Sequence, residues 1–487
     1  MRRHLLSIIN HLILMKSFFA FVACFFTLQL FAQTSSIEGV WYGSLDVGVK
    51  LRIVFNIKKA EGAYIATMDS PDQNAKGIKV AEVSITDNNV HLDIAVAGGL
   101  FDGKLINDTT IVGEWKQGQG KLPLTLIKSV NVLEGPKRPQ TPKPPYNYKA
   151  EEVAYTNADK SVKLSGTFTY PSTGNHFPTA ILITGSGQQD RDETIFGHKP
   201  FAVIADYLTN KGYAVLRVDD RGKGSSTGNV AKATSEDFAF DVALGIKFLK
   251  TRAEVDTNKL GLIGHSEGGY IAAYLAGTRK DINFIILLAG PGVKGLDLMA
   301  EQNSAYLQSS GISLGAASLY KNLYSEIGNA VLRSKDTAAA MNKAWESYKA
   351  WVNAAPQSSR IEVGIINDEV ARKTVKSLID AFSSPWMSYF LQCDASKYLE
   401  KTKAAVLALN GAKDIQVIAD QNINGIKQAL EKSKSRSYQT RIFPDLNHLF
   451  QHCVKCTVPE YAEVEETFSP EVLEEMGKWL DQNVKTR

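Results

Sequence analysis

The segment from residue 179 to residue 290 alternates apolar runs with longer stretches of helical character, and this alternation restricts the possible fold more than any other feature. The apolar runs are AILITG, YAVLRVDD, KLGLIGHS and INFIILLAG, and helical patterns occur near 199–211, near 235–252 and from about Gly268. Apolar runs spaced in this way are typical of a parallel sheet whose strands are covered by helices on both faces. The sequence therefore predicts an α/β domain.

The regular series is interrupted between about residues 296 and 395. The intervening sequence is rich in helical pattern, with AWESYKAWV and ARKTVKSLIDAF, and the next strand, AAVLALNG, begins only at Ala404. We expect this insertion to form a helical cap over the carboxyl edge of the sheet. The strand YQTRIF and a last helix near 470–483 complete a domain that we place at residues 149–487.

The sequence ahead of this domain has a different pattern of apolar and turn residues. Between residues 33 and 130, short β-type runs such as VWYGSL, LRIVFNI and TIVGEWK alternate with turn residues. They predict a small all-β domain, either a barrel or a sandwich. Residues 131–148 contain five prolines, which favour an extended, semi-rigid linker. Two domains are also the expectation for a chain of 487 residues.

The first 32 residues are expected to be a secretory signal peptide. MKSFFAFVACFFTLQLFAQ has a basic start, an apolar run and a small-residue end, and the predicted cleavage follows Ala32. A membrane anchor fits less well because Thr27 and Gln29 interrupt the apolar run. A lipoprotein signal at Cys24 fits less well because the sequence after that cysteine stays apolar. The mature protein is therefore expected to be exported, to the periplasm or outside the cell.

The charge of the chain argues against a nucleic-acid partner. The formal net charge is +4, but Arg2, Arg3 and Lys16 lie in the predicted signal peptide, which has no acidic residue, so the mature protein carries +1. No stripe rich in lysine or arginine follows. We expect a small-molecule substrate, and no membrane span after the signal peptide is removed.

One serine stands at a junction that resembles a reactive-site turn. Gly264-His265-Ser266-Glu267-Gly268 joins the apolar strand GLIG to the helical pattern YIAAYLAG. In a G-x-S-x-G elbow, the strained turn lifts the serine hydroxyl above the sheet edge, and side chains in place of the glycines would collide with the neighbouring strand and helix. A glycine-rich packing turn is the simpler alternative. A second match, residues 224–228, follows the charged loop DDRGK. It therefore lacks the preceding strand that such an elbow requires.

A nucleophilic serine needs a base and an acid, which follow it along the chain in this kind of sheet. Only His448 and His452 lie downstream of Ser266. His448 follows the strand YQTRIF, on a loop at the carboxyl edge, whereas His452 is expected at the surface. Asp414, the first carboxylate after the strand AAVLALNG, is the expected acid that orients the ring of His448. Asp445 is the rival acid.

An attacked carbonyl oxygen becomes an oxyanion, which needs hydrogen-bond donors already in place. One expected donor is the backbone N–H of Glu267, directly after the serine, and the other comes from the loop after AILIT, with Ser186 N–H preferred and Gly187 second. The charges that follow in QQDRDE, and those of DDRGKG, are either solvated or shape the cleft.

The cysteines admit two interpretations. Cys453 and Cys456 are close enough in sequence to pair in an oxidising compartment, which leaves Cys393 unpaired after the signal peptide is removed. Alternatively, His448, His452 and the two cysteines form a metal-like group. Adjacent His452 and Cys453 would have difficulty binding one tetrahedral zinc ion, so we expect no metal and no cofactor.

Taken together, these motifs resemble the α/β-hydrolase superfamily, and more narrowly a group of exported bacterial esterases with a small β-domain ahead of the hydrolase domain. The resemblance is carried by ITGSGQQDRDE, VLRVDDRGKGSSTG, GLIGHSEGG, SPWMSYFLQCD, LALNGAKDIQV and FPDLNHLFQ, and in the first domain by GVWYGSL and ATMDSPDQNAKGI. It implies ester hydrolysis with Ser266, Asp414 and His448 as the triad. Many relatives have His in place of Thr184, and usually Pro at Gln189 or its neighbour, which affects the shape of the oxyanion loop.

The function we expect is that of a serine hydrolase that cleaves carboxylic esters through an acyl-enzyme on Ser266. A serine peptidase or a thioesterase uses the same triad, and the fold alone does not choose between them. An aminopeptidase would need an acidic cluster in the cap, for which Glu301, Glu326 and Glu346 are available.

A function of another class is a non-catalytic protein that binds a carbohydrate or a lipid through its β-domain. Aromatic side chains are the usual lining of such a site, and the first domain offers Trp41, Tyr42, Tyr64 and Trp115. Aromatic residues of a small β-domain more often belong to its core.

Overall fold

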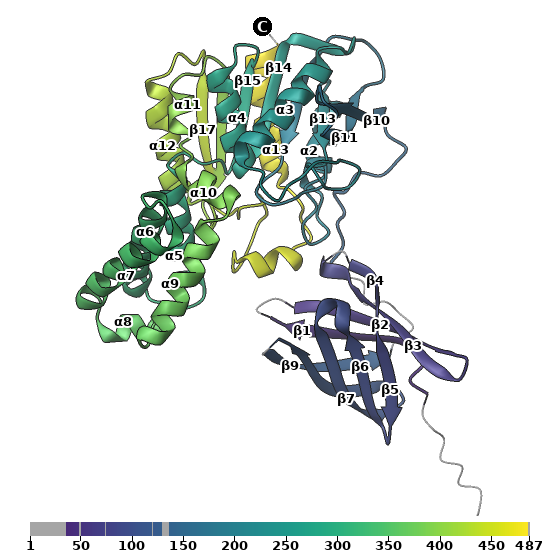
Figure 1. Cartoon of the computed structure of the whole chain (residues 1–487). Coiled ribbons are helices and arrows are strands. Elements are labelled where there is room, and N and C mark those ends of the chain that lie inside the picture. The colour runs from purple at the N-terminus through teal and green to yellow at the C-terminus, as the bar shows by residue number, and fades with distance from the viewer. Residues whose placement is uncertain (1–35, 48–49, 74, 119, 129–135, 486–487) are drawn as a thin grey trace, which may run out of the picture. The chain divides into compact units, whose positions relative to one another are not determined.

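The computed structural model describes residues 36–485, apart from 48–49, 74, 119 and 129–135. The predicted signal peptide therefore lies outside the described residues. The chain divides into two compact units, Met1–Leu133 and Glu134–Arg487, here called the β unit and the α/β unit (Figure 1). Within the described ranges, no helix combines the length and apolar character needed to cross a membrane.

The described part of the β unit forms an antiparallel sheet in the order β4-β3-β2-β1-β9-β8-β7-β6-β5. β5 also contacts β3, so the sheet curls around its own core (Figure 1). The strand bounds are β1 Gly39–Asp46, β2 Lys50–Ala60, β3 Ala63–Ser70, β4 Ala75–Lys79, β5 Glu82–Thr86, β6 Asn89–Ile94, β7 Gly99–Asn107, β8 Thr110–Gln117 and β9 Gly120–Lys128.

Alternating side chains explain how this sheet encloses a core. In β6, Val90, Leu92 and Ile94 are buried while the residues between them are more exposed, because successive side chains of a strand point to opposite faces. Trp41 and Trp115, at 0% and 4% exposure, belong to the same core. Of the other two candidate aromatic side chains, Tyr42 is buried and Tyr64 packs against the core. These four aromatic residues therefore offer little surface to a ligand.

The α/β unit is built on a second sheet, in the order β10-β11-β13-β12-β14-β15-β16-β17. β11 pairs antiparallel with both of its neighbours, and the other neighbouring strands are parallel. β15 and β16 are buried along their whole length, as strands covered on both faces should be. The bounds are β10 Tyr148–Thr156, β11 Lys163–Pro171, β12 Phe177–Ile183, β13 Ala214–Val218, β14 Val255–His265, β15 Phe284–Leu288, β16 Ala405–Gly411 and β17 Tyr438–Phe443.

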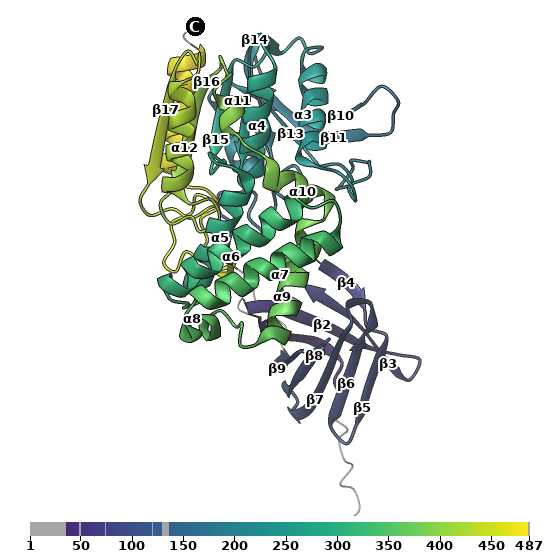
Figure 2. The ribbon, with the colours of Figure 1, turned by 60° about the vertical axis from the view of Figure 1, so that its left-hand side comes forward.

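Helices cover both faces of this sheet (Figures 1 and 2). One row consists of α3, α4, α11 and α12, each in contact with the next, and the other helices, α2 and α13, pack together. The bounds are α2 Pro200–Asn210, α3 Ser235–Leu249, α4 Glu267–Thr278, α11 Ser396–Leu399, α12 Ala419–Glu431 and α13 Pro470–Leu480. The α/β architecture expected from the alternating sequence is thus confirmed.

The sequence between β15 and β16 forms the helices expected of a cap. They gather at one end of the sheet in both views (Figures 1 and 2) and enclose a hydrophobic core of their own, which includes Leu323, Ile327, Val375 and Ile379. The bounds are α5 Gly295–Ser309, α6 Leu314–Leu332, α7 Thr337–Ala354, α8 Gln357–Glu362, α9 Asp368–Phe382 and α10 Pro385–Gln392.

The proline-rich segment ahead of β10 is anchored to the α/β unit. The guanidinium of Arg138 donates to the carbonyl oxygens of Phe196, Ala462 and Val464 at 3.0, 2.9 and 2.6 Å. The side-chain amide of Gln140 makes three hydrogen bonds with the backbone at positions 467 and 468. Residues 138–140 are therefore part of the α/β unit.

Candidate functional site

Ser266 forms the whole of the turn between β14 and α4. Its backbone has φ 53° and ψ −120°, a conformation that a residue with a side chain adopts only under strain. The N–H of Ser266 donates to the carbonyl oxygen of Leu288 at the end of β15, at 2.9 Å. The strained turn is thus fixed at the carboxyl edge of the sheet.

The glycines on either side of Ser266 have no room for a side chain. A Cβ atom at Gly264 would lie 2.0 Å from the carbonyl oxygen of Gly268, and one at Gly268 would lie 2.2 Å from that of Ile183 on β12. Both distances are far below van der Waals contact with backbone atoms, which cannot move aside cheaply. The structure therefore explains why side chains at these two positions would collide with the neighbouring helix and strand, as expected from the sequence.

The second G-x-S-x-G sequence has a structural role. The hydroxyl of Ser226 donates to the carbonyl oxygen of Asp219 at 2.7 Å and accepts from the N–H of Ser165 at 2.9 Å. Ser226 is buried, and no helix starts directly after it. It ties the loop after β13 to β11.

His448 and Asp414 meet as a buried pair. The distance from His448 Nδ1 to Asp414 Oδ2 is 2.8 Å, and the two side chains are 5% and 0% exposed. Asp414 Oδ1 accepts from the backbone N–H groups of Gln416 and Val417, so the carboxylate is held in one orientation. The rival acid Asp445 is exposed. His452 is also exposed, and its ring lies 2.9 Å from Glu466.

The loop of His448 packs against the residue that precedes the serine. The ring centroids of His265 and His448 are 4.7 Å apart, and His265 Nε2 lies 3.0 Å from the carbonyl oxygen of His448. No hydrogen bond joins the Ser266 hydroxyl to the His448 ring; both residues are among those described. Such bonds are often long in unliganded enzymes and shorten when substrate binds.

The expected oxyanion donors come from two elements that approach Ser266. Gly185 follows β12, and a Cβ added to it would lie 3.2 Å from the Cβ of Ser266, so the loop containing Ser186 begins beside the serine. Glu267 is the first residue of α4. Its N–H has no acceptor within the helix and lies at the positive end of the helix dipole.

Asp220 holds the two ends of this loop together, a role that the sequence analysis did not assign. Its carboxylate accepts from the Thr184 hydroxyl and from the Gln189 N–H, both at 2.8 Å. Burial raises the pKa of Asp220 to about 7; the hydrogen bonds from Gln189 and Thr184 oppose the shift, while the charges of Glu193 and Glu267 add to it. The Thr184 hydroxyl is therefore one of the two donors that hold Asp220.

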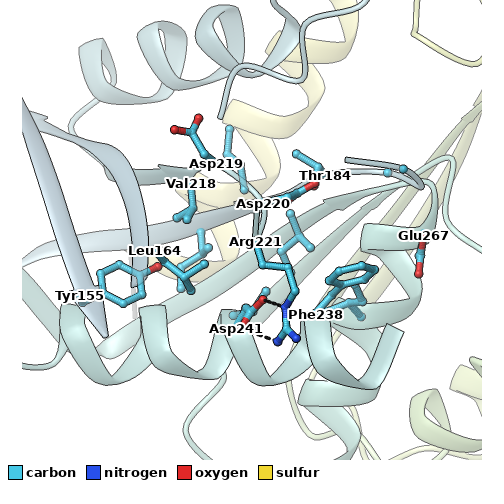
Figure 3. Close-up of a pocket in the computed structure, with 17 residues that line it drawn as sticks. Tyr155, Leu164, Thr184, Val218, Asp219, Asp220, Arg221, Phe238, Asp241 and Glu267 are labelled. Atoms are coloured by element: carbon cyan, nitrogen blue, oxygen red, sulfur yellow. Dashed lines mark hydrogen bonds and ion pairs between the residues drawn. The ribbon is translucent and has the colours of Figure 1, made fainter. Parts of the chain in front are cut away.

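A pocket of about 50 Å³ lies between this loop, the sheet and α3 (Figure 3). Tyr155 stands at one end of it and Glu267 at the other, and the Arg221–Asp241 ion pair borders it, with N–O distances of 2.7 and 2.9 Å. This volume accommodates a few water molecules. Of the charges in DDRGKG, Arg221 is therefore buried and paired.

The side chain of Glu267 connects the serine turn to the cap. Its carboxyl accepts from the Ser235 hydroxyl at 2.5 Å and from the indole Nε1–H of Trp386, on α10, at 3.0 and 3.2 Å. Burial raises the pKa of Glu267, although both hydrogen bonds lower it. The sequence motif SPWMSYFLQCD contains Trp386, but nothing in its local pattern identifies Glu267 as the partner.

Two further buried side chains lie beside the serine turn. Glu193 Oε1 accepts from Gly185 N–H at 2.7 Å and lies 2.9 Å from His265 Nδ1. Both side chains are less than a tenth exposed. Glu193 belongs to the charged run QQDRDE, and its burial contradicts, for this residue, the expectation of a solvated side chain.

The cysteine interpretation is settled in favour of a disulfide. Cys453 and Cys456 are joined, with a Cα–Cα distance of 5.0 Å, and Cys393 is free and buried. The two sulfur atoms that a metal ion would need are therefore already bonded to each other, and His448 is engaged with Asp414. Glu460 accepts from the backbone N–H of Val454, Lys455 and Cys456 and holds the disulfide loop.

The three acidic residues considered for an amine-binding cluster do not form one. Glu301, on α5, pairs with Lys321 at 2.8 Å. Glu326 and Glu346, on α6 and α7, are exposed. Among the described residues, the carboxylate oxygens of these three side chains do not all lie within 4.8 Å of one another, so they offer no joint site for a substrate ammonium group.

Comparisons with known proteins match part of the α/β unit, and the family match includes Ser266 but neither Asp414 nor His448. A family model described as serine aminopeptidase, S33 (Hydrolase_4) matches residues 199–354. Esterase EstD of Thermotoga maritima is 31% identical over 150 residues, which are 31% of this chain and 35% of that protein. The match thus spans about a third of the length of this curated relative.

Two solved hydrolase structures are also similar to part of this chain. The esterase Pf2001 of Pyrococcus furiosus is 15% identical with a TM-score of 0.42, and the alignment covers 69% of this chain and 92% of that one. The α/β hydrolase GrgF of a Penicillium species is 14% identical with a TM-score of 0.41, covering 69% and 99%.

The arrangement of the strands itself defines the fold. The sheet is parallel except at its first two strands, helices cover both faces, and the strained serine turn follows the central strand β14. The described part of the α/β unit therefore has the α/β-hydrolase fold, and an all-β unit precedes it in the chain.

Proposed function

We propose that this protein is a serine hydrolase that cleaves carboxylic esters, with Ser266 as nucleophile, His448 as general base and Asp414 as the acid that orients it. The observation that supports this most strongly is the buried contact of 2.8 Å between His448 Nδ1 and Asp414. A ring whose Nδ1 donates to a carboxylate presents Nε2 as the basic nitrogen.

In the first step, Ser266 Oγ forms a bond to the ester carbonyl carbon while His448 Nε2 takes the hydroxyl proton. The carbonyl oxygen becomes an oxyanion, for which the N–H groups of Glu267 and Ser186 are the proposed donors. The ester C–O bond then breaks, and the imidazolium returns its proton to the leaving alkoxide. An acyl-enzyme remains on Ser266.

In the second step, water attacks the acyl carbon and gives its proton to His448. The bond to Ser266 Oγ breaks, and His448 protonates this oxygen, so the free acid leaves and the enzyme is restored. The proposed mechanism needs no metal or cofactor.

Ester cleavage is preferred to peptide cleavage, although the matching family model is described as a serine aminopeptidase. The similarity to esterase EstD supports the ester substrate. The lack of a joint site at Glu301, Glu326 and Glu346 among the described residues weakens the case for recognition of a free amino terminus. A peptidase remains the second candidate, because both reactions use the same triad.

The test is hydrolysis of 4-nitrophenyl esters, acetate through decanoate, by the protein and by Ser266→Ala. We expect the variant to lose at least about a thousandfold in kcat, and the chain-length optimum to report the size of the acyl site. Aminoacyl 4-nitroanilides serve as the peptidase comparison. Faster cleavage of the anilides than of every ester would refute the ester assignment.

We also propose that the protein is exported after cleavage behind Ala32. The support is the signal-like sequence of the first 32 residues. The intact mass of the protein recovered from the periplasm or medium should equal that of a chain beginning at Gln33. Recovery of the full-length chain in the cytosol would contradict this proposal.

A further inference from the structure

The ring of His265 lies between two hydrogen-bond acceptors. Nδ1 is 2.9 Å from Glu193 Oε1, and Nε2 is 3.0 Å from the backbone carbonyl oxygen of His448. The apolar side chains nearby include Phe201, Leu288 and Leu449. The pair is buried, so water does not replace a lost contact.

The contacts determine how many protons this pair carries. A neutral imidazole has one N–H, whereas the carbonyl oxygen of His448 can only accept, so Nε2 must carry a proton. The second contact then needs a further proton, either on Nδ1 of His265 or on the carboxyl of Glu193. Without it, the Nδ1 lone pair would face a buried carboxylate. In both arrangements the pair holds one shared proton and is neutral in net charge.

The electrostatic surroundings keep this proton in place. Burial lowers the pKa of His265, but the charge and hydrogen bond of Glu193, the His448 carbonyl and the charge of Asp414 together raise it above its ordinary value. The other ionisable groups near the pair are the His448 ring, whose centroid is 4.7 Å from that of His265 with the two planes tilted by 46°, and Asp220, whose pKa is raised by the charge of Glu193.

The same pair contacts the three elements that the proposed reaction needs. Glu193 Oε1 accepts from Gly185 N–H at 2.7 Å, where the oxyanion loop begins. His265 Nε2 holds the backbone of His448. His265 itself immediately precedes Ser266 on the elbow. The pair is thus joined to the oxyanion loop, to the loop of His448 and to the turn that holds Ser266.

We propose that Glu193 and His265 are a proton-sharing positioning pair that fixes the oxyanion loop and the loop of the base relative to the nucleophile. This inference rests on the proposed function of Ser266. The pair does not touch the reacting atoms and acts through Gly185, Ser266 and the His448 backbone. Small displacements of such groups are costly, since an error of about 1 Å lowers rates by about a hundredfold.

The test compares Glu193→Gln and His265→Gln with a matched control, His198→Gln. His198 is also fully buried, and its ring contacts the Thr467 hydroxyl at 2.9 Å and the Tyr461 carbonyl oxygen at 2.8 Å. A hydroxyl can donate or accept, so one ring proton satisfies both contacts. Burial, with the charge of Arg138, lowers the pKa of His198 to about 4.

The first measurement is the rate at which a serine-directed phosphonate labels Ser266 in the full chain. We expect about a 10- to 100-fold decrease in Glu193→Gln and His265→Gln, with little change in His198→Gln. Among esters that are turned over, kcat should fall while KM changes little. Glu193→Asp, which keeps the charge, should recover part of the rate, and in Glu193→Gln the alkaline limit of kcat should move to lower pH.

The second measurement counts protons without relying on turnover. In protein labelled with nitrogen-15 at histidine and carbon-13 at the glutamate carboxyl, the His265 ring and the Glu193 carboxyl should together hold two protons at pH 7, and the ring signals concerned should be absent from His265→Gln. Should His265→Gln fail to fold, Glu193→Gln carries the test, because Gln retains the acceptor for Gly185.

The outcomes separate the two proposals. If the wild type is labelled at Ser266 and both variants react within twofold of it, the positioning role is wrong. A His265 ring that carries a single proton at pH 7 and no proton on Glu193 would equally overturn it. If the wild type is not labelled at all, the proposed function fails, and the positioning role fails with it.

Discussion

The indole N–H of Trp386 donates to both oxygens of the buried Glu267 carboxyl, at 3.0 and 3.2 Å. Trp386 lies on the last helix of the cap, and Glu267 directly follows Ser266, at the start of α4. The cap and the elbow are therefore joined by one polar contact inside the fold.

Trp386→Phe should weaken this junction while retaining most of the ring packing on Phe390, which stacks at 5.3 Å. A hydrogen bond to a carboxylate contributes about 1.5–3 kcal/mol, so the free energy of unfolding in urea should fall by about that amount. Trp345→Phe is the control, because the Trp345 indole N–H makes no hydrogen bond within the described structure. Equal losses in the two variants would contradict the prediction.

Asp414→Asn should preserve the fold but favour the wrong tautomer of His448, because the amide N–H₂ can face Nδ1 and force the proton onto Nε2. The expected decrease in kcat is about a thousand- to ten-thousandfold. It is measured as steady-state hydrolysis of the best 4-nitrophenyl ester. The matched control is the exposed rival, Asp445→Asn, which should retain nearly full activity; a comparable loss there would reverse the assignment.

Gly268→Ala should destabilise the protein by several kcal/mol, because the added Cβ would lie 2.2 Å from the Ile183 carbonyl oxygen on β12. Gly315→Ala is the control: it lies in α6, and a Cβ there meets nothing within 4 Å. That change should be neutral or stabilise by about 0.5–1 kcal/mol. Thermal unfolding followed by circular dichroism compares the two, and equal midpoints would contradict the prediction.

Asp220 should make the stability fall as pH rises. Its pKa is about 7 in the folded protein against an ordinary value of 3.8, so between these values the folded state holds a proton that the unfolded state has released. The stabilising contribution is complete below about pH 4 and is lost as pH rises to about 7, with a slope of about 1.4 kcal/mol per pH unit.

Asp220→Asn removes this titration and retains one acceptor for the loop. Measured by urea unfolding at several pH values, the stability of the variant relative to the wild type should rise between about pH 4 and about pH 7. A difference that is independent of pH would show that the Asp220 pKa is not raised.

The Cys453–Cys456 disulfide predicts a simple labelling result. In denaturant without reductant, the mature protein should take up one alkylating group, at Cys393, and after reduction it should take up three. The closed loop is short, so its loss should cost about 2 kcal/mol. Mass spectrometry counts the groups, and three before reduction would exclude the disulfide.

The parts of this fold that could be predicted are those encoded locally. Strands β12 to β15 and their helices follow from apolar runs with the right spacing, and the elbow follows from five consecutive residues. His448 and Asp414 could be paired because each is the first suitable group after its strand, and strands of one sheet bring such positions to one edge.

The contacts that could not be predicted join residues with no local signal. Glu193 and His265 are 72 positions apart, and Glu267 and Trp386 are 119 apart. Glu193 stands in a run of polar residues that is typical of a solvated loop, and only the tertiary fold buries it. A histidine between two acceptors is likewise invisible in sequence, because one of these acceptors is a backbone carbonyl.

The contacts of Arg138 and Gln140 determine where the chain can be divided. A fragment that begins at Tyr148, the start of the first strand of the hydrolase sheet, would lose both side chains and leave backbone groups between positions 462 and 468 without partners. This stretch lies shortly after the loop of His448. A fragment that could be transferred intact between proteins therefore starts ahead of Pro136 and includes the proline-rich segment.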